Sequence, residues 1–454
     1  MIEQDAHVQL AALRAGKITP AALMEETLDR IDQVNPKVNA IVALQDRKTL
    51  LNAAHDAPSG PLQGLPIAIK DLLETKGIRT THGSPIFKDN IPKQDSPLVA
   101  RLRKAGAVII GKTNTPEFGL GSHTYNPVYG VTRNPYGLDK SAGGSSGGAA
   151  VALATRMLAL ADGSDAMGSL RNPAGWNNVF GYRPSYGLVT NSSDTDMFLS
   201  QLATDGPMAR SIADLELLLT VQSEFDPRHP HATGPFKSER SSARKKIGWL
   251  GDWGGAYALE PGIRDLCEAA LGVMEQQGHE VIEIAPPFPA DALWQAWTTL
   301  RSWGNFVKRT PFLDHPHDLL KPELLWEIEQ GRKVTVDEIH KASALRSDWF
   351  RCTAQMEVDI LALPSAQMFP FDATLDWPKQ IGDRHMDTYH RWMEIVVPAS
   401  LTGLPALSVP AGFGAAGTPI GLQLIAHRGQ DADVLSLGRD YEASTDWVQR
   451  APRL

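Results

Sequence analysis

The sequence has few cysteines, no long apolar run and no extended block of like charge. Its two cysteines, Cys267 and Cys352, form no CxxC pair and are too few for a disulfide framework, which fits a reducing cytoplasm. No segment approaches the roughly 18 consecutive apolar residues of a membrane-spanning helix, and the acidic start MIEQDAHVQL predicts no signal peptide. The net charge is −8 and the one basic cluster, at 240–246, is short, so neither nucleic acid nor an anionic membrane is an expected partner.

The composition is that of a globular protein with a large core, since 42% of the 454 residues are apolar and 21% are charged. Thr19-Pro20 is typical of a helix start, and its apolar stripe ends before Asn35-Pro36. Short apolar strands are predicted at Leu65–Asp71 and Gly106–Gly111. Residues 246–284 are predicted to form a strand, a helix and a second strand in that order, which favours an α/β fold.

The segment 140–173 contains two Gly/Ser clusters, joined by a predicted small-residue helix and a short strand at 147–161. Ser145 and Ser146 lie among glycines, whose missing side chains let a ligand approach backbone N–H groups. Ser169 lies in the second cluster. Two serines in such turns suggest proton movement between hydroxyls, and that chemistry needs a base.

Several other kinds of site fit these residues less well. Gly143–Gly147 matches the G-x-S-x-G nucleophile elbow, but 133–140 is predicted to be a turn rather than the strand that an elbow needs. The loop also lacks the Lys-Ser/Thr of a phosphate-binding loop. The His-Pro-His triplets at 229–231 and 315–317 are interpreted as solvated loop histidines rather than metal ligands. His82, beside a glycine turn, stays an alternative base.

Two lysines are better candidates for the base. A lysine accepts a proton only when burial or nearby positive charge lowers its pKa. Lys70 and Lys112 each end a predicted apolar strand, which provides such surroundings. The residue pattern does not choose between them, and either could simply close a strand with a charge.

Two further segments have a distinct composition. Residues 225–242 are polar and turn-rich, and are predicted to be a linker or surface loop. Residues 290–371 are helix-like and rich in tryptophan, including Trp294, Trp297 and Trp349. An amphipathic stripe facing the core explains this pattern, and the wall of an apolar acyl pocket is the alternative.

Long motifs in a fixed order resemble those of the amidase signature enzymes. They are GLPIAIKD (64–71), GKTNTPEFG (111–119), SAGGSSGG (141–148), GSDAMGSLRNP (163–173), GYRPSYG (181–187), GLPALSVP (403–410) and GLQLI (421–425). The resemblance covers nearly the whole chain. It implies one α/β domain over 1–454, with the amidase signature fold and a mixed central β-sheet covered by helices on both faces. Within it, 1–60 would be an N-terminal helical layer, 61–215 the signature core and 290–371 a variable region facing the substrate.

The resemblance also implies a Ser-cisSer-Lys triad. Carried over by motif, Ser169 is the expected nucleophile, Ser145 the bridging serine after a cis peptide bond, and Lys70 the base. The backbone N–H groups of Ala166, Met167 and Gly168 would form the oxyanion hole. The supporting or substrate-binding residues would be Gly143, Gly144, Ser146, Asp165 and Arg171, the last two bracing the turn by hydrogen bonds.

One position departs from the family pattern. Many members have glycine where this chain has Met167, so the methionine could narrow the leaving-group side or alter the turn.

The expected function is hydrolysis of a linear carboxylic amide through an acyl-enzyme, without metal or cofactor. The acyl group would be aryl or aliphatic, and the substrate range extends to oligoamides or carbamates. The partners would be a small amide and water, and a homodimer is compatible with the sequence. The alternative is the catalytic A subunit of a glutamyl-tRNA amidotransferase-like complex, which needs partner subunits. A binding module without catalysis is opposed by the presence of all three triad residues.

Overall fold

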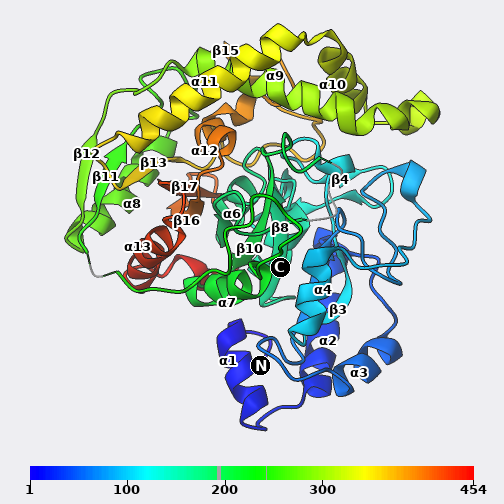
Figure 1. The fold of residues 1–454 in the computed structure, drawn as a ribbon. Helices are drawn as coiled ribbons and strands as arrows, with labels where there is room; N and C mark the ends of the chain where they lie inside the picture. The colour runs from blue at the N-terminus through cyan, green and yellow to red at the C-terminus, as the bar shows by residue number, and fades with distance from the viewer. Residues whose placement is uncertain (192–195, 242) are drawn as a thin grey trace.

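The computed structural model describes residues 1–191, 196–241 and 243–454. A mixed sheet of eight strands runs through the middle of the molecule (Figure 1). Its strands, in spatial order, are β12 (Glu280–Glu283), β11 (Lys246–Trp249), β13 (Ile360–Pro364), β17 (Pro419–Ala426), β16 (Ala406–Phe413), β9 (Phe180–Arg183), β10 (Thr204–Ala209) and β8 (Leu160–Asp165). Strand β11 is parallel to β12 and β13, and the other pairs are antiparallel.

The predicted β-α-β unit is confirmed, because helix α8 connects the parallel strands β11 and β12. The helices are α1 (Ala6–Arg14), α2 (Pro20–Val38), α3 (Arg47–His55), α4 (Pro97–Lys104), α5 (Gly147–Ala154), α6 (Arg171–Trp176), α7 (Ile212–Gln222), α8 (Ile263–Gln276), α9 (Ala290–Arg309), α10 (Pro322–Lys333), α11 (Val336–Ala354), α12 (Val397–Thr402) and α13 (Asp431–Ala443). In Figure 1 the first three lie at the bottom, and α9, α10 and α11 lie across the top.

Helices cover both faces of the central sheet. A side chain at Gly421 of β17 would meet Gly175 of α6 and the hydroxyl of Ser408, so α6 packs on the face to which Ser408 points. The neighbouring Leu407 lies against Gly438 of α13. Consecutive strand residues point to opposite faces, so α6 and α13 cover opposite faces of β16.

A second, three-stranded sheet lies beside the first and was not foreseen as a separate unit. It has the order β1 (Ile41–Val42), β3 (Val108–Thr113) and β2 (Pro66–Lys70), with β2 parallel to β3. Ile69 pairs with Lys112, and Lys70 pairs with Thr113. Since side chains alternate along a strand, Lys70 and Lys112 project from opposite faces of this sheet.

Two local predictions are wrong. Helix α2 begins at Pro20 with Thr19 as its N-cap, as expected, but it continues through Pro36 to Val38. Val38 is fully buried, and Asn39 in the left-handed region ends the helix, so packing of the last turn outweighs the hydrogen bond that proline lacks.

The second wrong prediction is the turn at 133–140. This segment is a small hairpin of β6 (Arg133–Asn134) and β7 (Gly137–Ser141). The Asn134 amide donates to the carbonyl oxygens of Ser141 and Trp176, at 3.2 and 2.8 Å. The turn-forming residues belong to the short loop of the hairpin, and they dominate the sequence pattern, so the strand that follows was not predicted. Two further hairpins pair β4 (Tyr125–Asn126) with β5 (Gly130–Val131), and β14 (Gln380–Ile381) with β15 (Arg384–His385).

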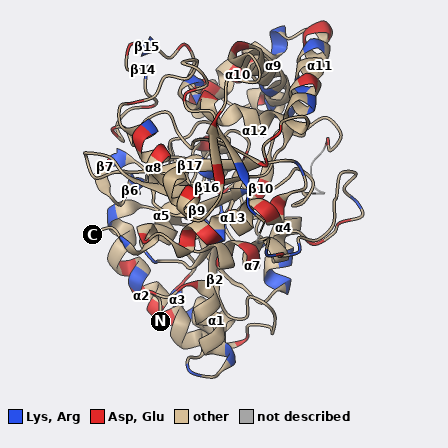
Figure 2. Ribbon diagram, turned by 90° about the vertical axis from the view of Figure 1, so that its left-hand side faces the viewer, with Lys and Arg blue, Asp and Glu red and all other residues tan. Residues whose placement is uncertain are grey.

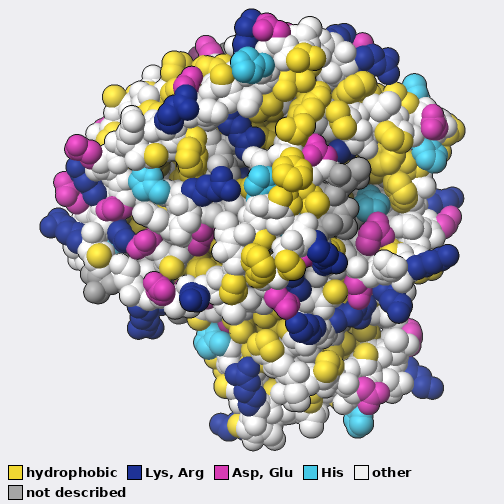
Figure 3. Space-filling model, viewed as in Figure 1, with side chains coloured by type: hydrophobic (Ala, Val, Ile, Leu, Met, Phe, Trp, Pro, Cys, Tyr) yellow, Lys and Arg dark blue, Asp and Glu magenta, His cyan; other side chains and the backbone are white. Residues whose placement is uncertain are grey.

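The charged residues on the surface are of mixed sign, as the absence of a long block of like charge in the sequence predicts. Acidic and basic residues are interspersed on the helices and loops of the side shown in Figure 2. On the face shown in Figure 3 both signs of charge are again mixed, and hydrophobic side chains gather in its upper part. Among the described residues, none of the helices has both the length and the apolar character that a membrane crossing needs. The described part of 225–242 contains neither helix nor strand, which confirms the predicted loop.

Candidate active site

The glycine-rich loop holds two serines against the ammonium group of Lys70. The peptide bond between Gly144 and Ser145 is cis, and helix α5 follows directly. Lys70 Nζ donates to Ser145 Oγ at 2.8 Å, to Ser146 Oγ at 2.9 Å and to Ser164 Oγ at 3.0 Å. Sequence reasoning missed Ser164, because it is one of many serines beside glycine and only the fold brings it to Lys70.

Burial sets the protonation of Lys70. Its side chain is 1% exposed, and this desolvation lowers its pKa to about 8, against the attraction of Asp162, Asp205 and Asp165. The carboxylate of Asp162 accepts the backbone N–H of Lys70 at 3.1 Å, and burial raises the pKa of Asp162 to about 6. A lysine with such a pKa is partly neutral near pH 7 and can accept a proton.

Lys112 lies in similar surroundings but has different contacts. Burial lowers its pKa to about 8 as well. Its ammonium donates to the Leu73 carbonyl oxygen at 2.6 Å and to Thr75 Oγ1 at 2.8 Å. The two lysines therefore share a depressed pKa, and only Lys70 contacts the serine clusters.

Ser169 lies in a turn between β8 and α6. Its carbonyl oxygen accepts the N–H of Ser146 at 3.3 Å, which connects the two serine clusters, and its side chain is 7% exposed. The N–H of Gly168 donates to Asp165 Oδ1 at 2.8 Å. Among the described residues, none accepts a hydrogen bond from the N–H of Ala166, Met167 or Ser169. These three groups can meet a developing negative charge, whereas that of Gly168 is already engaged.

A buried ion pair braces this turn. The Asp165 carboxylate accepts from Arg171 Nε at 3.0 Å and also binds Arg183, and all three side chains are fully buried. Burial alone would raise the pKa of Asp165, but the two guanidinium groups hold it well below its usual range. Arg171 also donates to Ser400 Oγ at 2.7 Å and Gln423 Oε1 at 2.6 Å, which fixes the turn to α12 and β17.

The side chain of Met167 packs in the hydrophobic core and is 4% exposed. It is not among the described residues that line the cavity at Ser169. Its backbone φ is not positive, whereas that of Gly168 is +78°. The turn therefore needs glycine at 168 but not at 167, and the methionine side chain does not narrow the cavity.

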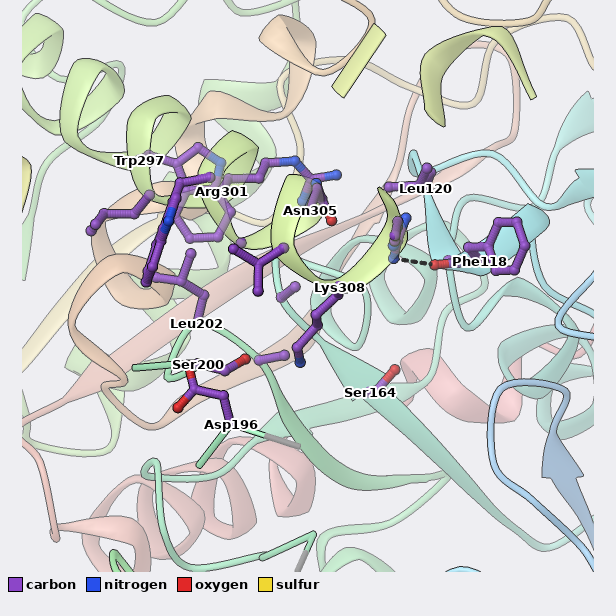
Figure 4. A pocket seen from close by; sticks show the side chains of 18 of the residues that line it. Phe118, Leu120, Ser164, Asp196, Ser200, Leu202, Trp297, Arg301, Asn305 and Lys308 are labelled. Carbon is purple, nitrogen blue, oxygen red and sulfur yellow. Dashed lines mark hydrogen bonds between the residues drawn. The ribbon is translucent and has the colours of Figure 1, made fainter. Parts of the chain in front are cut away.

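A cavity of about 260 Å³ opens onto Ser145, Ala166 and Ser169. Helix α9 forms one wall, and Trp297 and Lys308 of this helix are seen from inside in Figure 4. The stripe facing the core is confirmed for Trp297 and Trp349, which are fully buried in the hydrophobic core. Trp297 and Trp303 also line the cavity, and an acyl pocket there stays a prediction.

The other histidine candidates lie apart from the serines. The imidazole of His82 contacts Glu74 at 2.9 Å. His315 and His317 are exposed, as expected, but His229 is buried beside Tyr186, so the prediction of a solvated side chain is wrong there. In the part of the chain that the structure describes, no group of three or more His, Cys, Asp or Glu residues is arranged to hold a metal ion.

A Ser–His contact that sequence reasoning missed supports the loop. Ser141 Oγ lies 2.7 Å from His123 Nδ1 and accepts the N–H of Gly143 at 3.1 Å. The other ring nitrogen of His123 lies 3.2 Å from the Ala373 carbonyl oxygen. Burial lowers the pKa of His123 to about 4, so the ring is neutral and supports the glycine loop.

Known proteins are similar to this chain over its whole length. An acylamidase of Rhodococcus erythropolis is 31% identical, covering 100% of this chain and 98% of that protein. The A subunit of a glutamyl-tRNA(Gln) amidotransferase from Halorhodospira halophila is 32% identical, covering 97% of each. The crystal structure of a bacterial aryl acylamidase of the amidase signature family superposes with a TM-score of 0.89 at 26% identity, covering 98% of this chain and 97% of that one. The sequence profile of the family described as Amidase matches residues 22–435. The chain therefore belongs to the amidase family, the amidase signature enzymes.

Proposed function

We propose that the protein is an amidase that hydrolyses small linear carboxylic amides through a Ser-cisSer-Lys triad. The observation that carries the proposal is the contact of the buried Lys70 ammonium with Ser145, beside Ser169 in one cavity. Neutral Lys70 would take the Ser145 proton while Ser145 takes that of Ser169. Ser169 Oγ then attacks the amide carbon, and the oxyanion is met by the N–H groups of Ala166, Met167 and Ser169 rather than that of Gly168.

The second half of the reaction uses the same groups in reverse. The proton held by Lys70 returns through Ser145 to the leaving nitrogen, the carbon–nitrogen bond breaks, and the acyl group stays on Ser169. Water activated by the same relay attacks the ester, releases the carboxylic acid and restores the Ser169 hydroxyl. The proton taken from Ser169 ends on the leaving amine, and a proton from water restores the Ser169 hydroxyl, so the scheme balances with substrate and water.

The lining of the cavity supports an acyl group that is aryl or aliphatic. Apolar side chains predominate on its walls, and the bacterial aryl acylamidase and the acylamidase are among the relatives. Oligoamides and carbamates stay within the proposed range. We also propose a cytoplasmic location, on the strength of the two unpaired cysteines.

The amidotransferase A subunit is the second candidate, because relatives of that name are equally similar in sequence. Release of ammonia from glutamine that depends on added partner subunits would favour it. Hydrolysis of anilides by this chain alone would favour the amidase.

Labelling with a fluorophosphonate probe, followed by peptide mapping, tests the triad. The probe should modify Ser169 in the wild-type chain, and the labelling should disappear in Ser169→Ala and slow strongly in Ser145→Ala and Lys70→Ala. Lys112→Ala is the matched control, since Lys112 is equally buried but contacts neither serine cluster. Labelling that survives in Ser169→Ala, or that depends on Lys112 and not on Lys70, would refute the assignment.

A further inference from the structure

Three cationic side chains reach the cavity of Ser169 without a carboxylate partner. Lys308 and Arg309 come from the last turn of α9, and Arg346 comes from α11. Among the described residues, no carboxylate lies within 4.0 Å of any of the three. The lining also includes Asp196 and Arg301, but Arg301 is neutralised by the buried Glu327 at 2.6 Å. Three cations without a carboxylate partner and one carboxylate, Asp196, therefore border a mostly apolar cavity.

Arg309 lines the cavity, and the protein holds its guanidinium group in place. Its Nη2 donates to the Phe118 carbonyl oxygen at 3.0 Å, the one contact drawn in Figure 4. Its Nη1 is buried and has no hydrogen-bond acceptor among the described residues. Burial and the neighbouring charge of Arg301 lower the pKa of Arg309 to about 10, so the group stays charged near neutral pH. A charged guanidinium beside an apolar cavity is poorly solvated, and an anion in that cavity would offset the cost.

The position of Arg309 connects it to the reacting groups. Gly119 follows Phe118, and a side chain built at Gly119 would lie 3.5 Å from Ser145 Oγ. The carbonyl group that holds Arg309 is thus one residue from the wall of the serine site. The end of a helix favours cations, which explains a basic last turn in α9. It does not explain why the half-buried Arg309 lines the cavity, nor the presence of Arg346 on another helix.

Two adjoining hollows differ in charge. The second is lined by Lys70 and Lys308 together with Asp162 and Asp205, so its charges are balanced, unlike those of the first. Lys308 borders both hollows, and in Figure 4 its side chain extends from α9 into the space near Ser200 and Ser164. Ser145 and Ser169 line the first hollow and are absent from the lining of the second. The acyl group, which becomes bonded to Ser169 in the proposed reaction, therefore lies in the first hollow with the three cations.

We propose that the preferred substrates carry a carboxylate on the acyl part of the amide, as in monoamides of short dicarboxylic acids, and that Arg309 and Arg346 bind it, with Lys308 at the entrance. The proposal rests on the amidase function above. Arginine suits this task, because its planar fork binds a carboxylate through two parallel hydrogen bonds.

The test compares two substrates that differ only at the far end of the acyl chain. These are the p-nitroanilides of glutaric acid and of valeric acid, which place a carboxylate or a methyl group at the same position. At low salt, kcat/KM for the glutaryl compound should exceed that for the valeryl compound by about tenfold to a hundredfold, the effect of one charge-assisted contact. Added NaCl should reduce this ratio. Arg309→Gln and Arg346→Gln should each reduce it too, whereas Arg332→Gln, an exposed arginine of α10, should not.

Each outcome separates the two proposals. Hydrolysis of the valeryl compound with a ratio of one or less would overturn the carboxylate site and leave the amidase function standing. A preference for N-acetyl-p-aminobenzoate over acetanilide, without a glutaryl preference, would overturn the placement on the acyl side. Failure to hydrolyse any anilide, together with no fluorophosphonate labelling, would overturn the amidase function itself. The wild-type enzyme allows the same comparison without any variant. Glutarate should inhibit it competitively with a lower inhibition constant than valerate, and equal constants would contradict the carboxylate site.

Discussion

The pH dependence of the reaction follows from the buried position of Lys70. Lys70, the proposed base, must be neutral to accept a proton, so activity should rise with pH and level off above its pKa of about 8. The neutral fraction is then about 0.09 at pH 7 and about 0.97 at pH 9.5. The ratio of kcat/KM at these two pH values should be about 0.09. A solvated lysine would give a ratio of about 0.003.

Asp162→Asn changes this ratio in a known direction. The Asp162 carboxylate raises the pKa of Lys70, so its removal should lower that pKa further. The neutral fraction of Lys70 at pH 7 then increases, and the ratio should rise above the wild-type value of about 0.09. Asparagine keeps an oxygen to accept the Lys70 N–H, which the carboxylate accepts at 3.1 Å.

The assay is the release of p-nitroaniline from p-nitroacetanilide, which has no ionising group in this range. The ratio compares two pH values for the same enzyme, so a change in the plateau rate cancels. Asp139→Asn, at an exposed carboxylate, is the control and should keep the wild-type ratio. A flat profile, a rise that continues to pH 10, or a fall of the ratio in Asp162→Asn would refute the assignment of Lys70 as a desolvated base.

Three further substitutions probe the relay, the brace and the turn. Ser145→Ala should lower kcat/KM by at least about a hundredfold, since the proposed proton relay passes through this hydroxyl. Arg171→Met should lower the free energy of unfolding by about 3–5 kcal/mol in urea titrations, because it leaves a fully buried carboxylate without its main partner. Gly168→Ala should destabilise the fold by about 1–2 kcal/mol and reduce activity, since φ is +78° and the new methyl group would lie 2.9 Å from the Val396 side chain.

A matched control accompanies each of these changes. Ser146→Ala removes the other loop hydroxyl bound to Lys70 and should lower kcat/KM by about tenfold or less. Arg332→Met, at an exposed arginine, should change stability by less than about 0.5 kcal/mol. Gly272→Ala, at a helical glycine with nothing within 4 Å, should stabilise the protein by about 0.5–1 kcal/mol. Equal losses in a substitution and its control would contradict the role given to that residue.

Sequence patterns predicted the strands that carry Lys70 and Lys112, but they did not predict which of the two lysines contacts the serines. Both lysines end apolar strands, and burial lowers both pKa values. What separates them is the parallel register of β2 and β3, which places them on opposite faces of a sheet. Register between strands distant in the chain cannot be obtained from residue periodicity, and only the family resemblance chose Lys70 in advance.

Three other features could not be predicted from the sequence, because each depends on contacts between distant parts of the chain. Ser164 reaches Lys70 because β8 passes beside β2, a long-range contact without a local pattern. The cations of the cavity come from two helices separated in the sequence, and a charged residue in a helix is usually solvated. His229 lies in a polar segment, yet it packs against Tyr186.

The anchoring of the serine turn affects how the enzyme matures. Arg171 holds the Asp165 carboxylate, and its other donors end on Val396, Ser400 and Gln423. These acceptors are made late, long after Ser169 has left the ribosome. While the chain is being synthesised, the guanidinium of Arg171 lacks them, so we expect the turn that holds Ser169 to acquire its final shape only when β17 joins the sheet. A growing chain would then carry the proposed nucleophile without hydrolysing amides, and activity would appear when the last third of the polypeptide is in place.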